Sequence, residues 1–237
     1  HSMKKLLLIL LVSPCIIKAQ SDHFKASLIL GPSFSWMSSD DKNITTESNQ
    51  LGFKLHLQSE YIFLQKFSLT GGLGLSFIQG GKLGYALGGN LWSETALDIP
   101  KGDSLPNGVI LGYTVKYLEI PIGFKMTTGA YGRYRFFAQL PEFFLGLRLG
   151  ARGDIAGQGV STSDENIKHQ VQFLSIGWGL GGGTIYRLRD DLDLMIGVRY
   201  QQSITDVTDD SGKYFDGKSQ NSKDKINSID FRIGVVF

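Results

Sequence analysis

The residues of this chain that could carry out acid–base chemistry are few. Beyond the first 19 residues the histidines are His23, His56 and His169. Hydrolytic chemistry usually needs a nucleophile with a histidine base within hydrogen-bond reach and a carboxylate that orients the base. His56 is separated by even spacings from Lys54 and Glu60, so on a strand all three side chains share one face. The cluster could handle protons, but we favour a structural hydrogen-bond network.

Other signs of catalysis are weak. His56 could meet Glu119 across an enclosed interior, whereas His169 has no serine at a convincing position beside it. No metal-ligand spacing and no phosphate-cradling motif stands out. We therefore expect no catalytic residue, no cofactor and no metal, and we expect that the chain is not an enzyme. A lipid-modifying enzyme of the outer leaflet is kept as an alternative.

The elements that would position these residues are strands. Apolar and polar residues alternate with period two, as in Leu55 and Leu57 against Lys54, His56 and Gln58. We predict eight such strands, at about 24–36, 51–63, 67–77, 117–125, 142–152, 174–181, 192–201 and 229–237.

The predicted connections alternate in length. Short links fall at about 64–66, 127–133 and 187–191, and long polar links at about 38–50, 79–107, 153–166 and 205–225. Short turns at one rim and long loops at the other are typical of outer-membrane barrels, in which the short turns are periplasmic. The pattern predicts an all-β fold, an eight-stranded antiparallel up-and-down transmembrane β-barrel.

The charged residues support this polarity. Almost all those within the strands fall on the face opposite the apolar row, where a barrel in lipid has its lumen. A cation on the lipid side at the bilayer midplane would cost roughly 2–4 kcal/mol. The predicted lumenal network consists of Lys54, His56, Glu60, Glu119, Lys125, Glu142, Arg148, Asp193, Arg199, Asp230 and Arg232. Arg152 is predicted to share their face, and Lys116 and Lys168 are exceptions placed at the outer rim. A soluble lipocalin-like barrel is disfavoured, because this charged, glycine-rich face would make a poor dry core.

The amino-terminal segment has the features of an export signal. Lys4 and Lys5 precede an apolar run over 6–17, and Ala19 follows it at a suitable cleavage point. Residues 1–19 are predicted to be a tag remnant plus a cleaved signal peptide, and 20–237 the barrel domain. Cys15, the only cysteine, falls in this segment and is read as an ordinary signal-peptide residue.

The composition excludes one class of partner. Removing Lys4, Lys5 and Lys18 from the 24 basic residues leaves 21 against 22 acidic ones, a charge of −1. A nucleic-acid-binding protein would show a basic excess, so we expect no nucleic-acid partner. The mean hydropathy of −0.03 fits a barrel with one apolar and one polar face.

Three segments resemble a known family. The segment 229–237 ends in an aromatic residue and resembles the signal read by the barrel-assembly machinery, through Phe231, Ile233, Val235 and Phe237. The segment 117–124 (YLEIPIGF) is similar to a strand of the PorT-like outer-membrane β-barrel proteins, and 174–182 (LSIGWGLGG) is similar to their sixth strand. The resemblance implies an eight-stranded porin-family barrel, and some members belong to secretion and gliding machinery.

The loops suggest little chemistry. The tripeptide Arg152-Gly153-Asp154 occurs in integrin ligands but is short enough to arise by chance, and the aspartates of 205–225 match no calcium loop. The second long loop carries Leu91 and Trp92, so it is predicted to pack over the barrel mouth or to contact a partner.

Together these features predict an integral protein of the bacterial outer membrane with a structural, assembly or secretion-complex role and a side-chain-filled lumen. A narrow small-solute channel is a further alternative. The expected partners are outer-membrane lipid and lipopolysaccharide, the barrel-assembly machinery during insertion, and other secretion or envelope proteins.

Overall fold

The computed structural model describes residues 23–95, 97 and 104–237. The predicted signal peptide and Cys15 lie outside them. Within the described residues, no helix has the length and apolar character needed to cross a bilayer. In the described part of the chain, one 3₁₀ turn, Lys168–Gln170, interrupts an otherwise all-β structure.

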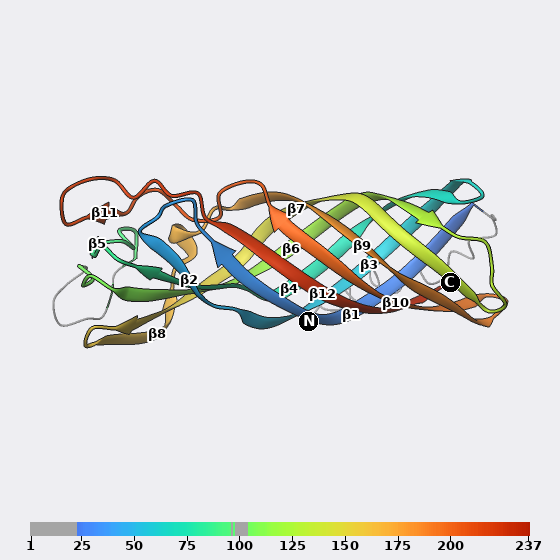
Figure 1. The fold of residues 1–237 in the computed structure, drawn as a ribbon, viewed down its shortest axis with the longest axis horizontal. Helices are drawn as coiled ribbons and strands as arrows, with labels where there is room; N and C mark the ends of the chain where they lie inside the picture. The colour runs from blue at the N-terminus through green and yellow to red at the C-terminus, as the bar shows by residue number, and fades with distance from the viewer. Residues whose placement is uncertain (1–22, 96, 98–103) are drawn as a thin grey trace, which may run out of the picture.

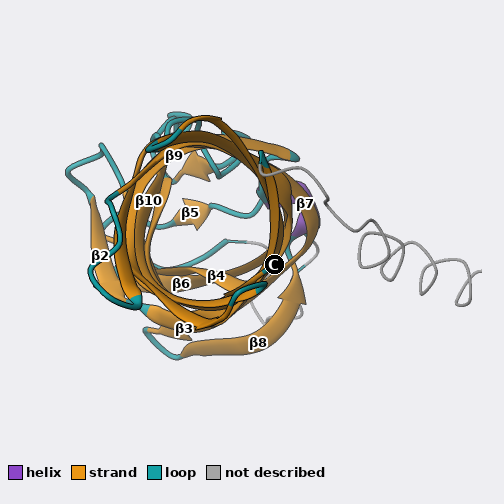
Figure 2. Ribbon diagram, turned by 90° about the vertical axis from the view of Figure 1, so that its right-hand side faces the viewer, coloured by secondary structure: helices purple, strands orange, loops and turns teal. Residues whose placement is uncertain are grey.

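Eight long strands close into a tilted antiparallel barrel, seen from the side in Figure 1 and along its axis in Figure 2. They are β1 (Phe24–Ser38), β3 (Gln50–Leu64), β4 (Phe67–Tyr85), β6 (Val109–Thr127), β7 (Tyr134–Gly157), β9 (Leu174–Arg189), β10 (Leu192–Ser203) and β12 (Lys225–Val236). Neighbours in sequence pair with one another, and β1 pairs with β12 to close the ring. The predicted fold class is confirmed.

The two faces of each strand differ as the alternation predicts. On β1, Leu28 and Leu30 are 40% and 42% exposed on the outside, whereas Ser33 and Ser35 are fully buried in the lumen. On β12, Phe231 and Ile233 face outward and Asp230 and Arg232 face inward. An exposed apolar exterior around a buried polar interior is what a barrel in lipid requires.

Several strands run further than predicted, because β-bulges interrupt the alternation. Ile78 has a φ of 57°, and the pairing of β4 with β6 shifts register between Ser76 and Gln79. The pairing of β6 with β7 shifts at Tyr117, which faces Arg148 while Lys116 faces Gly150. A bulge inserts one residue into one strand, so every later side chain changes face.

This change of face corrects the prediction for Arg152. Its side chain lies outside the barrel, 3.6 Å from the Asp164 carboxylate, and the side chains of Ala151 and Ile155 occupy the interior instead. Arg152, Gly153 and Asp154 all lie within β7, where the first two pair with β8.

The long connections carry further strands at one end of the barrel. The first is largely β2 (Ile44–Ser48), which pairs with the far end of β4. The third contains β8 (Val160–Asn166), which pairs with β7. The second and fourth meet through the short pair β5 (Gly89–Asn90) and β11 (Lys213–Tyr214). The opposite end carries the tight turns 65–66, 128–133 and 190–191, beside the start of β1 and the end of β12, and we call it the short-turn end.

Candidate functional site: the closed lumen

A network of charged side chains crosses the middle of the lumen. Arg199 on β10 donates from Nη1 to Glu142 Oε1 at 2.6 Å and from Nη2 to Asp230 Oδ2 at 2.8 Å. All three side chains are at most 2% exposed. Taking a charge out of water is expensive unless it is paired and hydrogen-bonded, and here each charge faces an opposite one.

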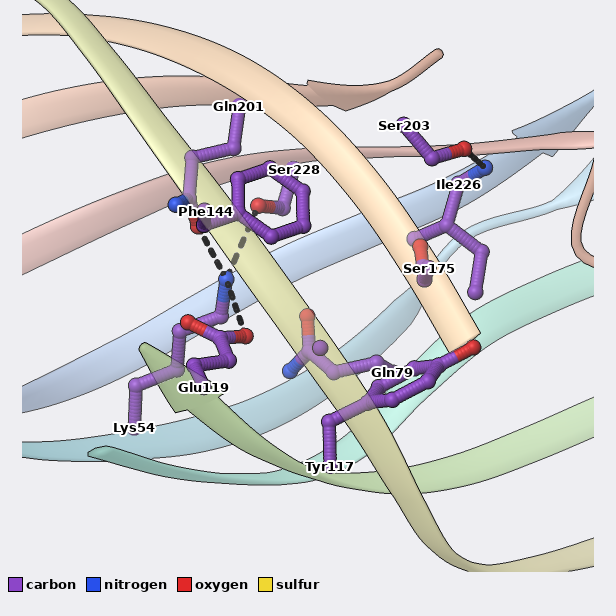
Figure 3. A pocket seen from close by; sticks show the side chains of 11 residues that line it. Lys54, Gln79, Tyr117, Glu119, Phe144, Ser175, Gln201, Ser203, Ile226 and Ser228 are labelled. Carbon is purple, nitrogen blue, oxygen red and sulfur yellow. Dashed lines mark hydrogen bonds and ion pairs between the residues drawn. The ribbon is translucent and has the colours of Figure 1, made fainter. Parts of the chain in front are cut away.

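Lys54 on β3 extends the network across the barrel (Figure 3). Its ammonium lies 3.2 Å from Asp230. It also lies 3.6 Å from Glu119 and donates to Gln201 Oε1 at 2.6 Å, as Figure 3 shows. The other Glu119 oxygen lies 3.0 Å from His56 Nε2. His56 is therefore hydrogen-bonded to a carboxylate that also faces a lysine.

Arg232 is held by amides rather than by carboxylates. It donates to Gln139 at 3.0 Å and to Gln58 at 3.2 Å, and Gln139 in turn donates to Thr70 at 2.9 Å. Gln58 was predicted to share a face with Lys54 and His56, but neither Gln58 nor Gln139 was included in the predicted network. Lys54, Arg199 and Arg232 balance Glu119, Glu142 and Asp230, so these six residues carry no net charge.

Glycines on the inner face make room for this network. A Cβ on Gly74 would stand 2.0 Å from His56 Cδ2. On Gly181 it would stand 3.3 Å from the Arg199 Cβ, and on Gly197 3.0 Å from the Phe137 ring. At Gly181 and Gly197 a carbonyl oxygen of the neighbouring strand lies closer still, at 3.0 Å and 2.7 Å, so backbone as well as side chains excludes a Cβ at these positions.

Two apolar clusters enclose the charged network along the barrel axis. Towards the short-turn end lies a cluster of Ile29, Phe137, Ile185, Met195 and Val236. Towards the long loops lies a larger cluster of strand and loop residues. The larger cluster includes Met37, Leu83, Tyr85, Leu91, Trp92, Leu105, Tyr113, Val115, Ile155, Ile167, Val171 and Val207. From the long loops inward, the lumen is therefore apolar, then charged, then apolar, before a second group of charges at the short-turn end.

The second long loop contributes directly to the larger cluster. Trp92 is 1% exposed and donates from its indole nitrogen to the Tyr113 hydroxyl at 3.0 Å. That hydroxyl lies 3.1 Å from the hydroxyl of Tyr85. Of the two predictions for this loop, the structure shows packing over the barrel mouth.

Between the network and the larger cluster the free space is small. A cavity of about 20 Å³ is lined by Lys54, Tyr117, Glu119 and Gln201 among others (Figure 3). This volume accommodates about one water molecule and no solute.

A second group of charges lies at the short-turn end. Lys125 donates to Glu60 at 2.5 Å, and Asp193 pairs with Arg135 and lies 3.9 Å from Lys25. Ten of the eleven residues expected in the lumenal network are buried in the interior, and they divide between this group and the central one. The exception is Arg148, which is partly exposed and donates to the Val171 carbonyl at 2.7 Å, so it holds a loop.

The residues of the expected assembly signal lie on the outer face of the closing strand. Phe231, Ile233 and Phe237 are 46%, 49% and 42% exposed, and Val235 is half-buried on the same face. β12 pairs with both β1 and β10, so these side chains line the seam at which the barrel closes.

The fourth loop holds an acidic group outside the membrane. Asp224 is fully buried and accepts hydrogen bonds from Thr208 and Ser222. Burial raises its pKa to about 6, and burial also raises the pKa of the neighbouring Asp206. Among the described residues no group of three or more His, Cys, Asp or Glu is arranged to hold a metal ion.

Comparison with solved structures gives low-identity matches over most of the chain. Neisserial surface protein A is 14% identical with a TM-score of 0.47, covering 90% of this chain and 95% of its own. OprG from Pseudomonas aeruginosa is 11% identical with a TM-score of 0.44, covering 91% and 96%. Comparison with curated protein sequences gives no match.

One similar structure corrects a prediction. The outer-membrane protease OmpT from Escherichia coli is 8% identical with a TM-score of 0.42, covering 92% of this chain and 97% of its own. The prediction that the chain is not an enzyme, which rested on the missing histidine–nucleophile pair, is therefore corrected: a protease is among the similar barrels, so the barrel fold leaves an enzymatic role open.

A family model agrees with the architecture. The model described as "outer membrane protein beta-barrel domain" matches residues 18–209, which is most of the chain. The match covers β1 to β10 and therefore seven of the eight barrel strands. The chain belongs to this outer-membrane β-barrel family, and its location is the bacterial outer membrane.

Proposed function

We propose that this protein acts in the outer membrane as a structural or assembly component, with a lumen filled by its own side chains. The observation that carries the proposal is the order of layers in the lumen. A buried ion network lies between the cluster of Phe137 and Met195 and the cluster of Trp92 and Tyr113. A permeating ion would have to displace apolar side chains twice and break buried ion pairs between them.

The size of the barrel supports the same proposal. An eight-stranded barrel has an interior only just wide enough for its own side chains. Here Arg199 and Arg232 occupy the middle of it, together with the carboxylates and amides that they contact. The two apolar clusters make a narrow small-solute channel the weaker alternative.

We also propose the finer assignments that the sequence suggests. The protein is exported with a cleaved signal peptide, which together with the tag remnant makes up residues 1–19, and β12 is read by the barrel-assembly machinery through Phe231, Ile233, Val235 and Phe237. A PorT-like subtype, with other secretion or envelope proteins as partners beside lipid and lipopolysaccharide, is supported by the segment 117–124.

Conductance in planar bilayers tests the sealed lumen. The purified full chain is expected to insert without producing steady ion currents. A matched pair of variants makes the result interpretable: Phe137→Ala with Met195→Ala opens the apolar cluster, and Leu69→Ala with Leu73→Ala removes similar volume from the lipid-facing side. Steady, ohmic currents from the unmodified chain would overturn the proposal. We expect brief currents from the Phe137→Ala, Met195→Ala variant and none from the Leu69→Ala, Leu73→Ala variant.

A further inference from the structure

Two hollows adjoin at the short-turn end of the barrel. One is a vestibule of about 230 Å³ inside the barrel, whose charged lining includes Lys25, Glu60, Lys125, Arg135 and Asp193. The other is a groove of about 480 Å³ lined mainly by Phe67, Met126, Tyr131, Phe136 and Ala138. Both hollows are lined by Lys66, Phe67, Thr127, Thr128 and Gly129, so these residues form a common wall between them.

The vestibule has an excess of positive charge. Its lining contains Lys25, Lys66, Lys125 and Arg135 against the two carboxylates of Glu60 and Asp193, a net charge of +2. Lys125 is matched by Glu60, but Asp193 is shared between Lys25 and Arg135.

Two further observations show that the excess positive charge of the vestibule is not neutralised by carboxylates of the protein. Arg187 also lies 4.0 Å from Asp193, so three cations face this one carboxylate. Within the described residues no carboxylate lies within 4.0 Å of the Lys66 ammonium. The hollow is therefore suited to an anionic group.

The groove has the opposite character. Phe67, Met126 and Phe136 lie on the outer face of the strands and are 40%, 50% and 51% exposed. Tyr131, on the turn between β6 and β7, is 72% exposed. Tyrosines are enriched where a membrane protein meets the headgroup region, and the apolar residues beside Tyr131 face hydrocarbon.

We infer that the two hollows together bind one anionic phospholipid of the periplasmic leaflet. Its phosphate group lies at the mouth of the vestibule, near Lys66 and Lys25, and an acyl chain lies in the groove of Phe67, Met126 and Phe136. The occupant is an amphiphile because the hollows differ in polarity and share a wall. It is a periplasmic-leaflet lipid because short turns of outer-membrane barrels face the periplasm. The inference does not depend on the sealed lumen.

Native mass spectrometry of the full chain in detergent tests this inference. The probes are phosphatidylglycerol and phosphatidylethanolamine at equal concentration, and we expect a single bound lipid with about tenfold preference for phosphatidylglycerol. Equal retention of the two lipids overturns the inference.

Two pairs of variants locate the site. Lys25→Gln with Lys66→Gln is expected to abolish the preference, whereas Lys82→Gln with Lys116→Gln, which removes two lysines from the long-loop end, leaves it intact. Ala138→Trp fills the groove and is expected to lower phosphatidylglycerol binding several-fold, whereas Ile233→Trp on the outer face of β12 is not. Equal effects within either pair contradict the proposed site.

A competition experiment distinguishes binding of the lipid from binding of a free phosphate compound. Glycerol 3-phosphate is the headgroup without acyl chains, and at concentrations comparable to those of the lipid it is expected not to compete. Complete competition would show that the vestibule binds a free phosphate compound and that the groove plays no part, which overturns the lipid assignment.

Discussion

Arg199 on β10 and Glu142 on β7 form a 2.6 Å ion pair across a strand that separates them in the sheet. β9 lies between β7 and β10, so the two side chains meet over β9 on the lumenal face of the sheet. Each residue is about 1% exposed. Each charge is stabilised by the other, because neither side chain can reach water.

Breaking this pair on one side is expected to cost roughly 3–5 kcal/mol of unfolding free energy, because a buried charge is left without its partner. Arg199→Met and Glu142→Gln should both show it in urea titrations of the refolded barrel in detergent. The control is Arg152→Ala, which removes an exposed ion pair with Asp164 and should cost at most about 1 kcal/mol. Equal effects at the two sites would show that the lumenal pair is not a strong contact.

The absence of a side chain at Gly74 is expected to leave the space that the His56 ring occupies. A Cβ on Gly74 would stand 2.0 Å from that ring, so Gly74→Ala should cost roughly 1–3 kcal/mol through overpacking. His56→Ala should relieve most of that cost, giving a coupling energy in a double-mutant cycle. Gly150→Ala, where nothing lies within 4 Å of the added Cβ, is the control. Additive effects of Gly74→Ala and His56→Ala would exclude the clash.

The fourth loop is expected to lose stability as the pH rises. Burial raises the pKa of Asp224 from 3.8 to about 6, so the folded loop favours the protonated carboxyl. The protonated Asp224 carboxyl stabilises the folded loop fully when the pH is below 3.8, the pKa of this group in the unfolded chain. This stabilisation is lost as the pH rises through about 6, the pKa in the folded loop. Its size is about 2–3 kcal/mol.

Hydrogen exchange of the amides of residues 204–224, corrected for intrinsic pH dependence, measures this loss. Protection should be greater near pH ~5 than near pH ~7.5, and Asp224→Asn should remove the difference. A pH dependence that survives in Asp224→Asn would assign it to another group.

The outer face should tolerate charge only at the rim. Ile233 is 49% exposed on β12, and Ile233→Lys is expected to cost roughly 2–4 kcal/mol of folding free energy in lipid bilayers. Thr114→Lys, two residues beyond Lys116 on β6, should cost about 0–1 kcal/mol. Folding yields into vesicles over a urea series measure both variants. An equal cost at the two positions would be inconsistent with the outer face lying in hydrocarbon.

The sequence alone determined the polarity of the wall and the number of strands. Whether Leu55 or His56 faces lipid depends only on the period-two geometry of a strand, which is local. The turn lengths are local as well, and they placed the short turns correctly at 65–66, 128–133 and 190–191.

Only the tertiary structure decided which charges meet, where the alternation changes face, and what closes the mouth. The contact of Arg199 with Glu142 depends on the register of several strands, and Gln58 and Gln139 became visible as partners of Arg232 only once that register was known. The bulge near Leu149 on β7 moved Arg152 outside. Trp92 reaches Tyr113 from a loop without periodicity. Such contacts join residues far apart in the chain, so they cannot be predicted from the pattern of residues that are neighbours in sequence.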